Sequence, residues 1–281
     1  MEQINLDISL KQSNALKGIA LTLLLIHHLF YINNGMFDDY TIAGYPIVNT
    51  LGVVCKVCVA IFVFLSGYAL GKTNAVVSIS HIKSFYLRRF TKLFLNYWLI
   101  WVLFVPIGVF IFHRYLKDVY ADPVWLYGIL DFIGLINVTG HLGYNPTWWF
   151  YSCIILLYLI FPIIAISISR WPKSKWVFLF LSVFIFFIPC SILNPIKPYL
   201  FPFTLGFIMS NTLFINTLPP PFVKSLFSGT LNTAGVILLT LLFITSVILR
   251  LSIPYALLWD TCITIIHVSY KHLTLPTNSL V

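Results

Sequence analysis

The sequence predicts an all-α protein, a polytopic bundle of transmembrane helices. Hydrophobic residues make up 59% of the 281 residues, and charged residues make up only 9%. A soluble globular domain carries roughly 25% charged residues, so this chain has too few to cover a folded surface in water. The net charge of +9 does not indicate a nucleic acid partner, because the Lys and Arg residues fall between apolar runs rather than in a polar domain. We therefore expect a lipid bilayer around the protein and no nucleic acid partner.

Eight hydrophobic segments approach the length of about 20 residues that a transmembrane helix requires. They lie near residues 15–34, 50–71, 92–113, 148–169, 176–195, 198–216, 232–251 and 254–268, and the last of them is short. Residues 124–138 are also apolar but are interrupted by Asp131 and two glycines. We expect this segment to be interfacial or re-entrant. No internal repeat and no separate soluble domain is visible.

The basic residues predict a cytoplasmic N-terminus. With that orientation, eleven of the 17 Lys and Arg residues fall on the cytoplasmic side and four fall outside, which is the bias that membrane topology follows. We expect no cleavable signal peptide, because the first apolar run lacks a small-residue cleavage site after it.

The C-terminal segment 269–281, SYKHLTLPTNSLV, follows the last apolar run abruptly. It resembles a tail that recurs on unrelated chains from environmental sequence assemblies, where adaptor sequence has been translated. We expect residues 1–268 to form one transmembrane domain and the natural chain to continue differently after residue 268. A short polar tail is the alternative.

Lys17 and His28 are the ionisable residues that stand out in the first predicted span, where residues 16–30 read LKGIALTLLLIHHLF. Eleven residues make three helical turns plus about 20°, so these two side chains share one helix face about 16 Å apart, whereas His27 points about 80° away. A histidine facing a cavity in the membrane can act as a general base near neutral pH. Alternatively, the histidines lie near the headgroups or bond to a neighbouring helix, and Lys17 extends to the cytoplasmic surface.

The spacing Lys17-x10-His28 resembles the R/K-x10-H signature of the integral-membrane acyltransferase-3 family, which includes bacterial O-acetyltransferases of surface glycans. Further stretches are similar to the family's in the same order: FVFLSGYALG (62–71), RRFTKLFLNYW (88–98), TWWFYSCIILLYLIFP (147–162) and LFPFTLGFIMSN (200–211). The resemblance covers roughly residues 10–215. In this chain Lys17 replaces the commoner arginine, so a bidentate phosphate contact becomes a single-point one, and Leu95 replaces the usual proline. Members of this family usually have about ten transmembrane spans of about 20 residues each, so we expect this chain to be truncated.

The resemblance implies an O-acyltransferase of the bacterial cytoplasmic membrane. Its donor would be acyl-CoA, with acetyl-CoA expected, and its acceptor a hydroxyl of a cell-envelope or exported polysaccharide or of a lipid-linked glycan. His28 would be the general base, although attack by His28 itself as a nucleophile stays open. The residues that would hold the phosphates of acyl-CoA are Lys17, Arg88, Arg89 and Lys92. The alternative is that these cations only set the topology.

The residues that would bind the acceptor glycan are less clearly marked in the sequence than Lys17 and His28. Ser66 precedes Gly67, which predicts a close backbone approach beside the site, and no base adjoins Ser66 in the sequence. Four aromatic residues fit an interfacial belt: Tyr97, Trp98, Trp148 and Trp149. Alternatively, Trp148 and Trp149 stack on a sugar ring. His141 and Asn145 are candidates for lining an acceptor entrance.

Two other classes of function stay open. A transporter or flippase would use Lys17 and His28 in a translocation path, and a structural membrane subunit would use the histidines only in packing. We expect no bound cofactor and no metal site: Cys55 and Cys58 have C-x2-C spacing but lack a second ligand pair.

Overall fold

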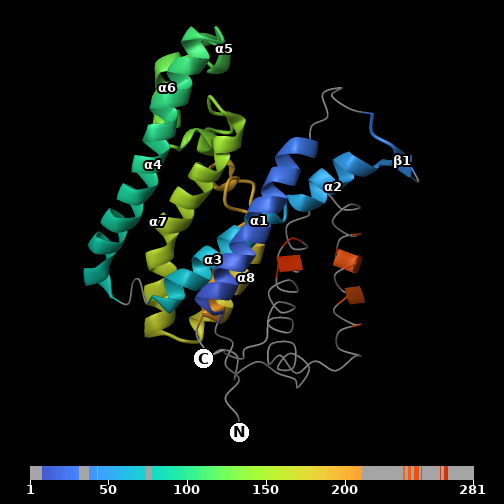
Figure 1. Cartoon of the computed structure of the whole chain (residues 1–281). Coiled ribbons are helices and arrows are strands. Elements are labelled where there is room, and N and C mark those ends of the chain that lie inside the picture. The colour runs from blue at the N-terminus through green and yellow to red at the C-terminus, as the bar shows by residue number, and fades with distance from the viewer. Residues whose placement is uncertain are drawn as a thin grey trace. The chain divides into compact units, whose positions relative to one another are not determined.

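The computed structural model describes residues 8–31, 38–42, 44–73 and 78–210, with isolated residues between 237 and 264. The described part is mostly helical (Figure 1). It divides into two compact units, one of residues 1–73 and 201–281 and one of residues 74–200. The predicted segments 232–251 and 254–268 lie mostly outside the described residues, and segment 269–281 lies outside them entirely.

Four helical stretches of the described chain are long and apolar enough to cross a membrane. They are Leu10–Phe30, Ile47–Lys72, Ile79–Phe110 and Pro146–Arg170. Two shorter apolar helical stretches follow, Ser174–Phe187 and Leu200–Met209. The expected helical membrane protein is therefore supported, and the count of eight spans stays a prediction.

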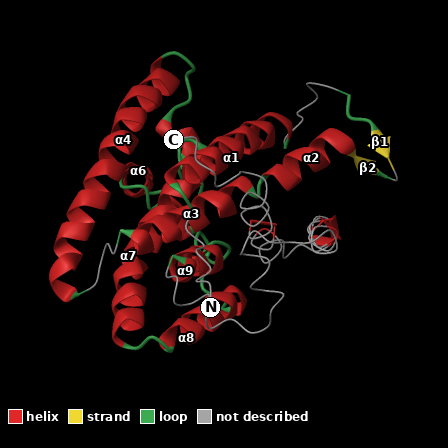
Figure 2. Cartoon of the chain, turned by 60° about the horizontal axis from the view of Figure 1, so that its bottom comes forward, coloured by secondary structure: helices red, strands yellow, loops and turns green. Residues whose placement is uncertain are grey.

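In the first unit, helix α1 (Leu10–Phe30) begins earlier than residue 15 because a capping box starts it. The Ser9 hydroxyl accepts a hydrogen bond from the Gln12 amide at 3.2 Å, and the Gln12 side chain accepts one from the Ser9 amide at 2.9 Å. These reciprocal bonds satisfy two amides that would otherwise lack partners at a helix start. A hairpin of β1 (Thr41–Ile42) and β2 (Tyr45–Pro46) precedes the next helix; it pairs Thr41 with Pro46 and Ile42 with Tyr45 (Figure 2).

The second predicted span, residues 50–71, lies within the apolar stretch Ile47–Lys72, which consists of two helices. Helix α2 (Ile47–Cys55) ends at Lys56, and α3 (Cys58–Lys72) begins two residues later. The amides of Lys56 and Val57 donate to carbonyl groups three residues back, at 3.3 and 3.2 Å, instead of four residues back. This tightening of the helical turn separates α2 from α3.

Helix α3 packs closely against α9 (Leu200–Met209) through small residues. A Cβ atom at Gly67 would collide with the carbonyl oxygen of Phe203, and one at Gly206 would collide with the carbonyl oxygen of Phe64. Glycines on both helices allow the two backbones to meet, as small residues do between membrane helices. The close approach expected at Gly67 is confirmed.

In the second unit, α4 (Ile82–Phe110) follows a short 3-10 turn, η1 (Ile79–His81). Helix α4 begins ten residues before the apolar segment predicted near residues 92–113. Aromatic side chains spaced four residues apart line the first turns of α4. The ring centres of Tyr86 and Phe90 are 5.4 Å apart, those of Phe94 and Trp98 are 5.3 Å apart, and both pairs are stacked. Such pairs stabilise a helix, so the cationic residues of this segment lie within α4 rather than ahead of it.

The segment expected to be interfacial or re-entrant forms α6 (Val124–Phe132), which follows α5 (Leu116–Val119). Nine residues extend only about 14 Å, less than half of the hydrocarbon thickness. The Trp98 indole N–H donates to the Phe132 carbonyl at 2.9 Å, and the two rings stack at 5.4 Å. This helix therefore packs on α4 and is too short to cross a bilayer by itself.

The second unit continues through two 3-10 turns, η2 (Ile136–Thr139) and η3 (Pro146–Trp148), into α7 (Trp149–Arg170). The Tyr86 hydroxyl of α4 donates to the Leu159 carbonyl of α7 at 2.9 Å. The remaining elements are α8 (Ser174–Phe184), η4 (Ile185–Phe187) and η5 (Ser191–Leu193).

Candidate functional site

Lys17 and His28 both lie on the exposed surface of α1, whereas Leu16, Ala20 and His27 are buried. Neither Lys17 nor His28 has a hydrogen bond or an ion pair with another described residue. The two side chains therefore lie outside the packed interior of the described residues, on one face of the helix and at the axial separation of about 16 Å that eleven residues impose.

His27 behaves differently from its neighbour. Its side chain is 8% exposed, and its Nδ1 atom lies 2.8 Å from the carbonyl oxygen of Gly52 in α2. The sequence allowed either histidine to form a hydrogen bond with a neighbouring helix, and in the structure His27 forms it.

The cationic residues of α4 do not all lie together. Arg88 and Lys92 are one helical turn apart and line a groove of about 490 Å³ that also includes Asn96. Arg89 is half-buried and does not line this groove. The Arg88 side chain donates to the carbonyl of Ser84 at 3.2 Å, which restricts its position.

Arg88 and Lys92 have no acidic partner among the described residues. Unneutralised cations on an apolar helix are costly unless an anion or a polar cavity faces them. Two cations and an amide on successive turns suit an anionic group such as a phosphate. Asn96 is missing from the residues predicted for this site, and its spacing of four from Lys92 and eight from Arg88 is the signal that identifies it.

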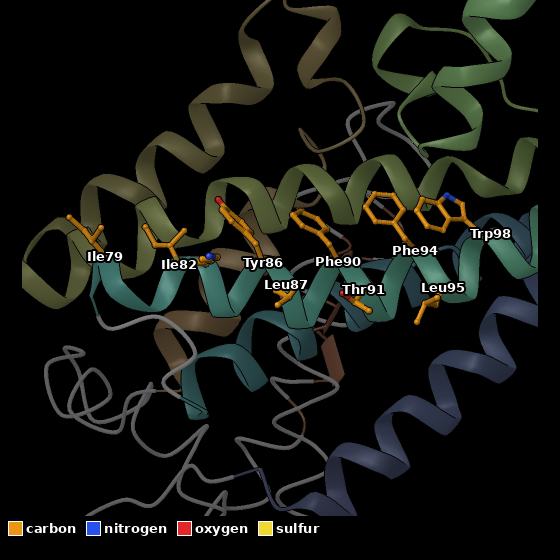
Figure 3. Close-up of a pocket in the computed structure, with 10 residues that line it drawn as sticks. Ile79, Ile82, Tyr86, Leu87, Phe90, Thr91, Phe94, Leu95 and Trp98 are labelled. Atoms are coloured by element: carbon orange, nitrogen blue, oxygen red, sulfur yellow. The ribbon is translucent and has the colours of Figure 1, made fainter.

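A ridge of Leu87, Thr91 and Leu95 separates the Arg88–Lys92 groove from a larger one of about 840 Å³ on the same helix. Figure 3 shows the rings of Tyr86, Phe90, Phe94 and Trp98 following one another along that second groove. One side of the ridge is therefore cationic and the other is aromatic.

The residues predicted for the acceptor side fall in both units. Ser66 is half-buried in α3, and its hydroxyl has no hydrogen bond with another described residue. Trp148 and Trp149 are half-buried at the start of α7: Trp148 packs edge-on against Tyr97, with ring centres 5.6 Å apart, and Trp149 stacks on Tyr199 at 5.5 Å. The Asn145 side chain starts this turn by accepting from the Thr147 amide at 2.9 Å.

Tyr97 is buried: it is 1% exposed, and its hydroxyl donates to the main-chain oxygen of Asp131 at 2.6 Å. Asp131 is buried as well, at 1% exposed. Its carboxylate accepts hydrogen bonds from the hydroxyls of Tyr97, at 3.2 Å, and Tyr120, at 2.5 Å, and from the Tyr144 amide, at 2.8 Å. Burial and the hydrogen bond to Asp131 raise the pKa of Tyr120 above its usual value. A buried carboxylate thus joins α4, α6 and the loop before η3.

The described site residues therefore form two sets. Lys17 and His28 share a face of α1 in the first unit, and Arg88, Lys92 and Asn96 share a face of α4 in the second. The exposed histidine is equipped for proton transfer, and the cationic groove is equipped for anion binding.

A family model described as an acyltransferase domain matches residues 10–277. The match covers most of the chain, so the chain belongs to the acyltransferase-3 family, and this membership indicates a membrane acyltransferase. No curated protein and no solved structure matches the chain. The family resemblance found in the sequence is confirmed.

Proposed function

We propose that the protein is an O-acetyltransferase that moves an acetyl group from acetyl-CoA to a hydroxyl of a cell-envelope or exported polysaccharide or of a lipid-linked glycan. The observation that carries this proposal is that Lys17 and His28 lie on the same exposed face of α1, in a chain that matches the acyltransferase domain. The protein resides in the bacterial cytoplasmic membrane with its N-terminus inside and eight spans, as the basic residues and apolar segments indicate.

His28 acts as the general base in this mechanism. Its imidazole takes the proton from the acceptor hydroxyl while the oxygen attacks the thioester carbonyl carbon. The tetrahedral intermediate collapses, the carbon–sulfur bond breaks, and the CoA thiolate recovers the proton from His28. Direct transfer is preferred to an acyl-histidine intermediate because no second base or orienting carboxylate follows His28 along α1.

The donor is held through its phosphates. Arg88 offers a fork of donors and Lys92 a point charge, and both line one groove with Asn96. Lys17 supplies a separate cation on the face of α1 that carries His28, and Arg89 adds to the positive potential of α4. The separation of about 16 Å between Lys17 and His28 along α1 is comparable to an extended pantetheine arm, so a phosphate near Lys17 and a thioester near His28 suit one acyl-CoA molecule.

The decisive experiment replaces His28 with alanine and measures transfer from labelled acetyl-CoA in isolated membranes, with O-acetyl groups on surface glycan quantified by mass spectrometry. We expect a loss of about 100-fold or more, the scale of general-base catalysis. His81→Ala is the matched control, because His81 is exposed at the start of α4 and bonds locally to Ser78.

The result depends on equal abundance of the variants in the membrane. Normal acetylation in His28→Ala would refute the proposed chemistry. If export of the glycan stopped while acetylation continued, a transporter or flippase would be favoured instead.

A further inference from the structure

The last turn of α1 is fixed to α2 by a hydrogen bond of a buried histidine. The Nδ1 atom of His27 lies 2.8 Å from the Gly52 carbonyl oxygen. A carbonyl oxygen only accepts, so Nδ1 carries the proton and donates it. This bond selects one tautomer of the His27 ring and holds its orientation.

Gly52 also allows the two helices to approach. A Cβ atom at this position would lie 2.7 Å from the Tyr31 amide nitrogen and 2.8 Å from the Phe30 carbonyl carbon. Both neighbours are backbone atoms, which cannot rotate away as a side chain can. Gly52 is therefore both the acceptor for His27 and the point of contact for the end of α1.

Two further residues complete this connection. The Asn49 side-chain amide donates to the Tyr31 carbonyl at 2.5 Å, at the C-terminal end of α1. The Asp39 carboxylate accepts from the amides of Val48 and Asn49, at 2.9 and 2.8 Å, and so satisfies the first turn of α2. We call His27, Gly52, Asn49 and Asp39 the α1–α2 anchor.

His28 sits in the turn that the α1–α2 anchor holds. The His27 ring centre is 5.2 Å from that of His28 and 4.9 Å from that of Tyr31. His28 has no hydrogen bond of its own among the described residues, so the backbone turn determines where its imidazole is presented. A displacement of about 1 Å of a reacting group can reduce a rate about 100-fold.

We propose that His27 is a positioning residue, which fixes the last turn of α1 on Gly52 and thereby sets the place of the His28 imidazole for acyl transfer. The role of His27 rests on the proposed function of His28. It assigns different tasks to the two adjacent histidines: His28 exchanges the proton, and His27 donates to a carbonyl throughout.

The test compares His27→Leu, which removes the donor, with His27→Asn, whose side-chain amide places a donor near the position of Nδ1. In the full-length protein in membranes, His27→Leu should lower kcat 10- to 100-fold and leave the KM for acetyl-CoA within about twofold. His27→Asn should recover most of the rate. Gly18→Ala is the control on the same helix, because a Cβ atom there meets no atom within 4 Å.

A spectroscopic measurement checks the hydrogen bond without any activity. In protein labelled with 15N-histidine, the His27 ring should give the spectrum of the neutral tautomer protonated at Nδ1, and this signal should be missing in His27→Asn. The opposite tautomer at His27 would overturn the inference.

The outcomes separate the inference from the proposed function. Full activity of His27→Leu, together with lost activity in His28→Ala, would overturn the positioning role alone. Equal loss in His27→Leu and His27→Asn, or a raised KM, would also overturn it. Full activity in His28→Ala would refute the proposed function. If His27→Leu does not accumulate, Asn49→Ala tests the α1–α2 anchor more mildly, and an unchanged kcat there would contradict the proposal.

Discussion

The crossing of α3 and α9 offers a prediction of stability that requires no knowledge of the substrate. Replacing Gly206 with alanine places a Cβ atom against the Phe64 residue of α3. The new atom would lie 3.0 Å from the Phe64 carbonyl carbon and 3.2 Å from its Cα, and closer still to the carbonyl oxygen, whereas ordinary contacts are 3.4–4 Å. All three atoms belong to the backbone, so α9 must move away from α3.

The size of the effect follows from what this movement loosens. Phe64 and Phe203 are both 0% exposed at the crossing, so a small separation of the helices weakens contacts along both. Overpacking of this kind costs about 3 kcal/mol at the upper end of its usual range, while alanine regains about 1 kcal/mol over glycine in a helix. We therefore expect Gly206→Ala to lower the free energy of unfolding by about 2 kcal/mol.

The assay follows thermal unfolding of the detergent-solubilised protein with a thiol-reactive fluorescent dye, because Cys55, Cys58 and Cys153 are free and buried. Gly18→Ala is the control, since a Cβ atom there has open space, and it should be neutral or slightly stabilising. A Gly206→Ala protein as stable as Gly18→Ala would refute the packing argument.

Other predictions follow from the second unit. Asp131→Ala leaves the Tyr120 hydroxyl and the Tyr144 amide without their acceptor, whereas the Tyr97 hydroxyl keeps the main-chain oxygen of residue 131. It should therefore lower the free energy of unfolding by about 3 kcal/mol in the same thermal assay; an unchanged stability would contradict this role. Burial and the hydrogen bond to Asp131 raise the pKa of Tyr120 in the folded protein, so the unfolded chain loses the Tyr120 proton at a lower pH than the folded protein does. The protonated hydroxyl therefore stabilises the fold below about pH 10, and this stabilisation is lost as the pH rises above that value. Denaturation from pH 8 to 12 should accordingly show a shallower alkaline decline for Tyr120→Phe, and an identical decline would exclude this contribution. Asn96→Ala should raise the KM for acetyl-CoA about tenfold with little change in kcat, because the Asn96 amide no longer bonds to a charged phosphate of the donor. An unaltered KM in initial-rate kinetics would refute this role.

Local sequence patterns were sufficient for several features of the fold and the site. The apolar run around Leu24 and the lysine and histidine at its ends place Lys17 and His28 on one face of α1, because helix periodicity depends only on spacing. The Ser66–Gly67 pair likewise predicts a close backbone approach. The early start of α4 was not predicted, since aromatic pairs such as Tyr86 and Phe90 extend the helix beyond the apolar run.

By itself, the sequence determined that this is a helical membrane protein of the acyltransferase-3 family, with a cation and an imidazole eleven residues apart. Only the tertiary structure decided that His27 bonds to Gly52, 25 residues away, while His28 stays exposed. It also decided that Asp131 meets Tyr97, 34 residues distant. Composition and helical spacing are local properties of a chain, but the partner of a buried polar group depends on which backbone reaches it after the helices pack.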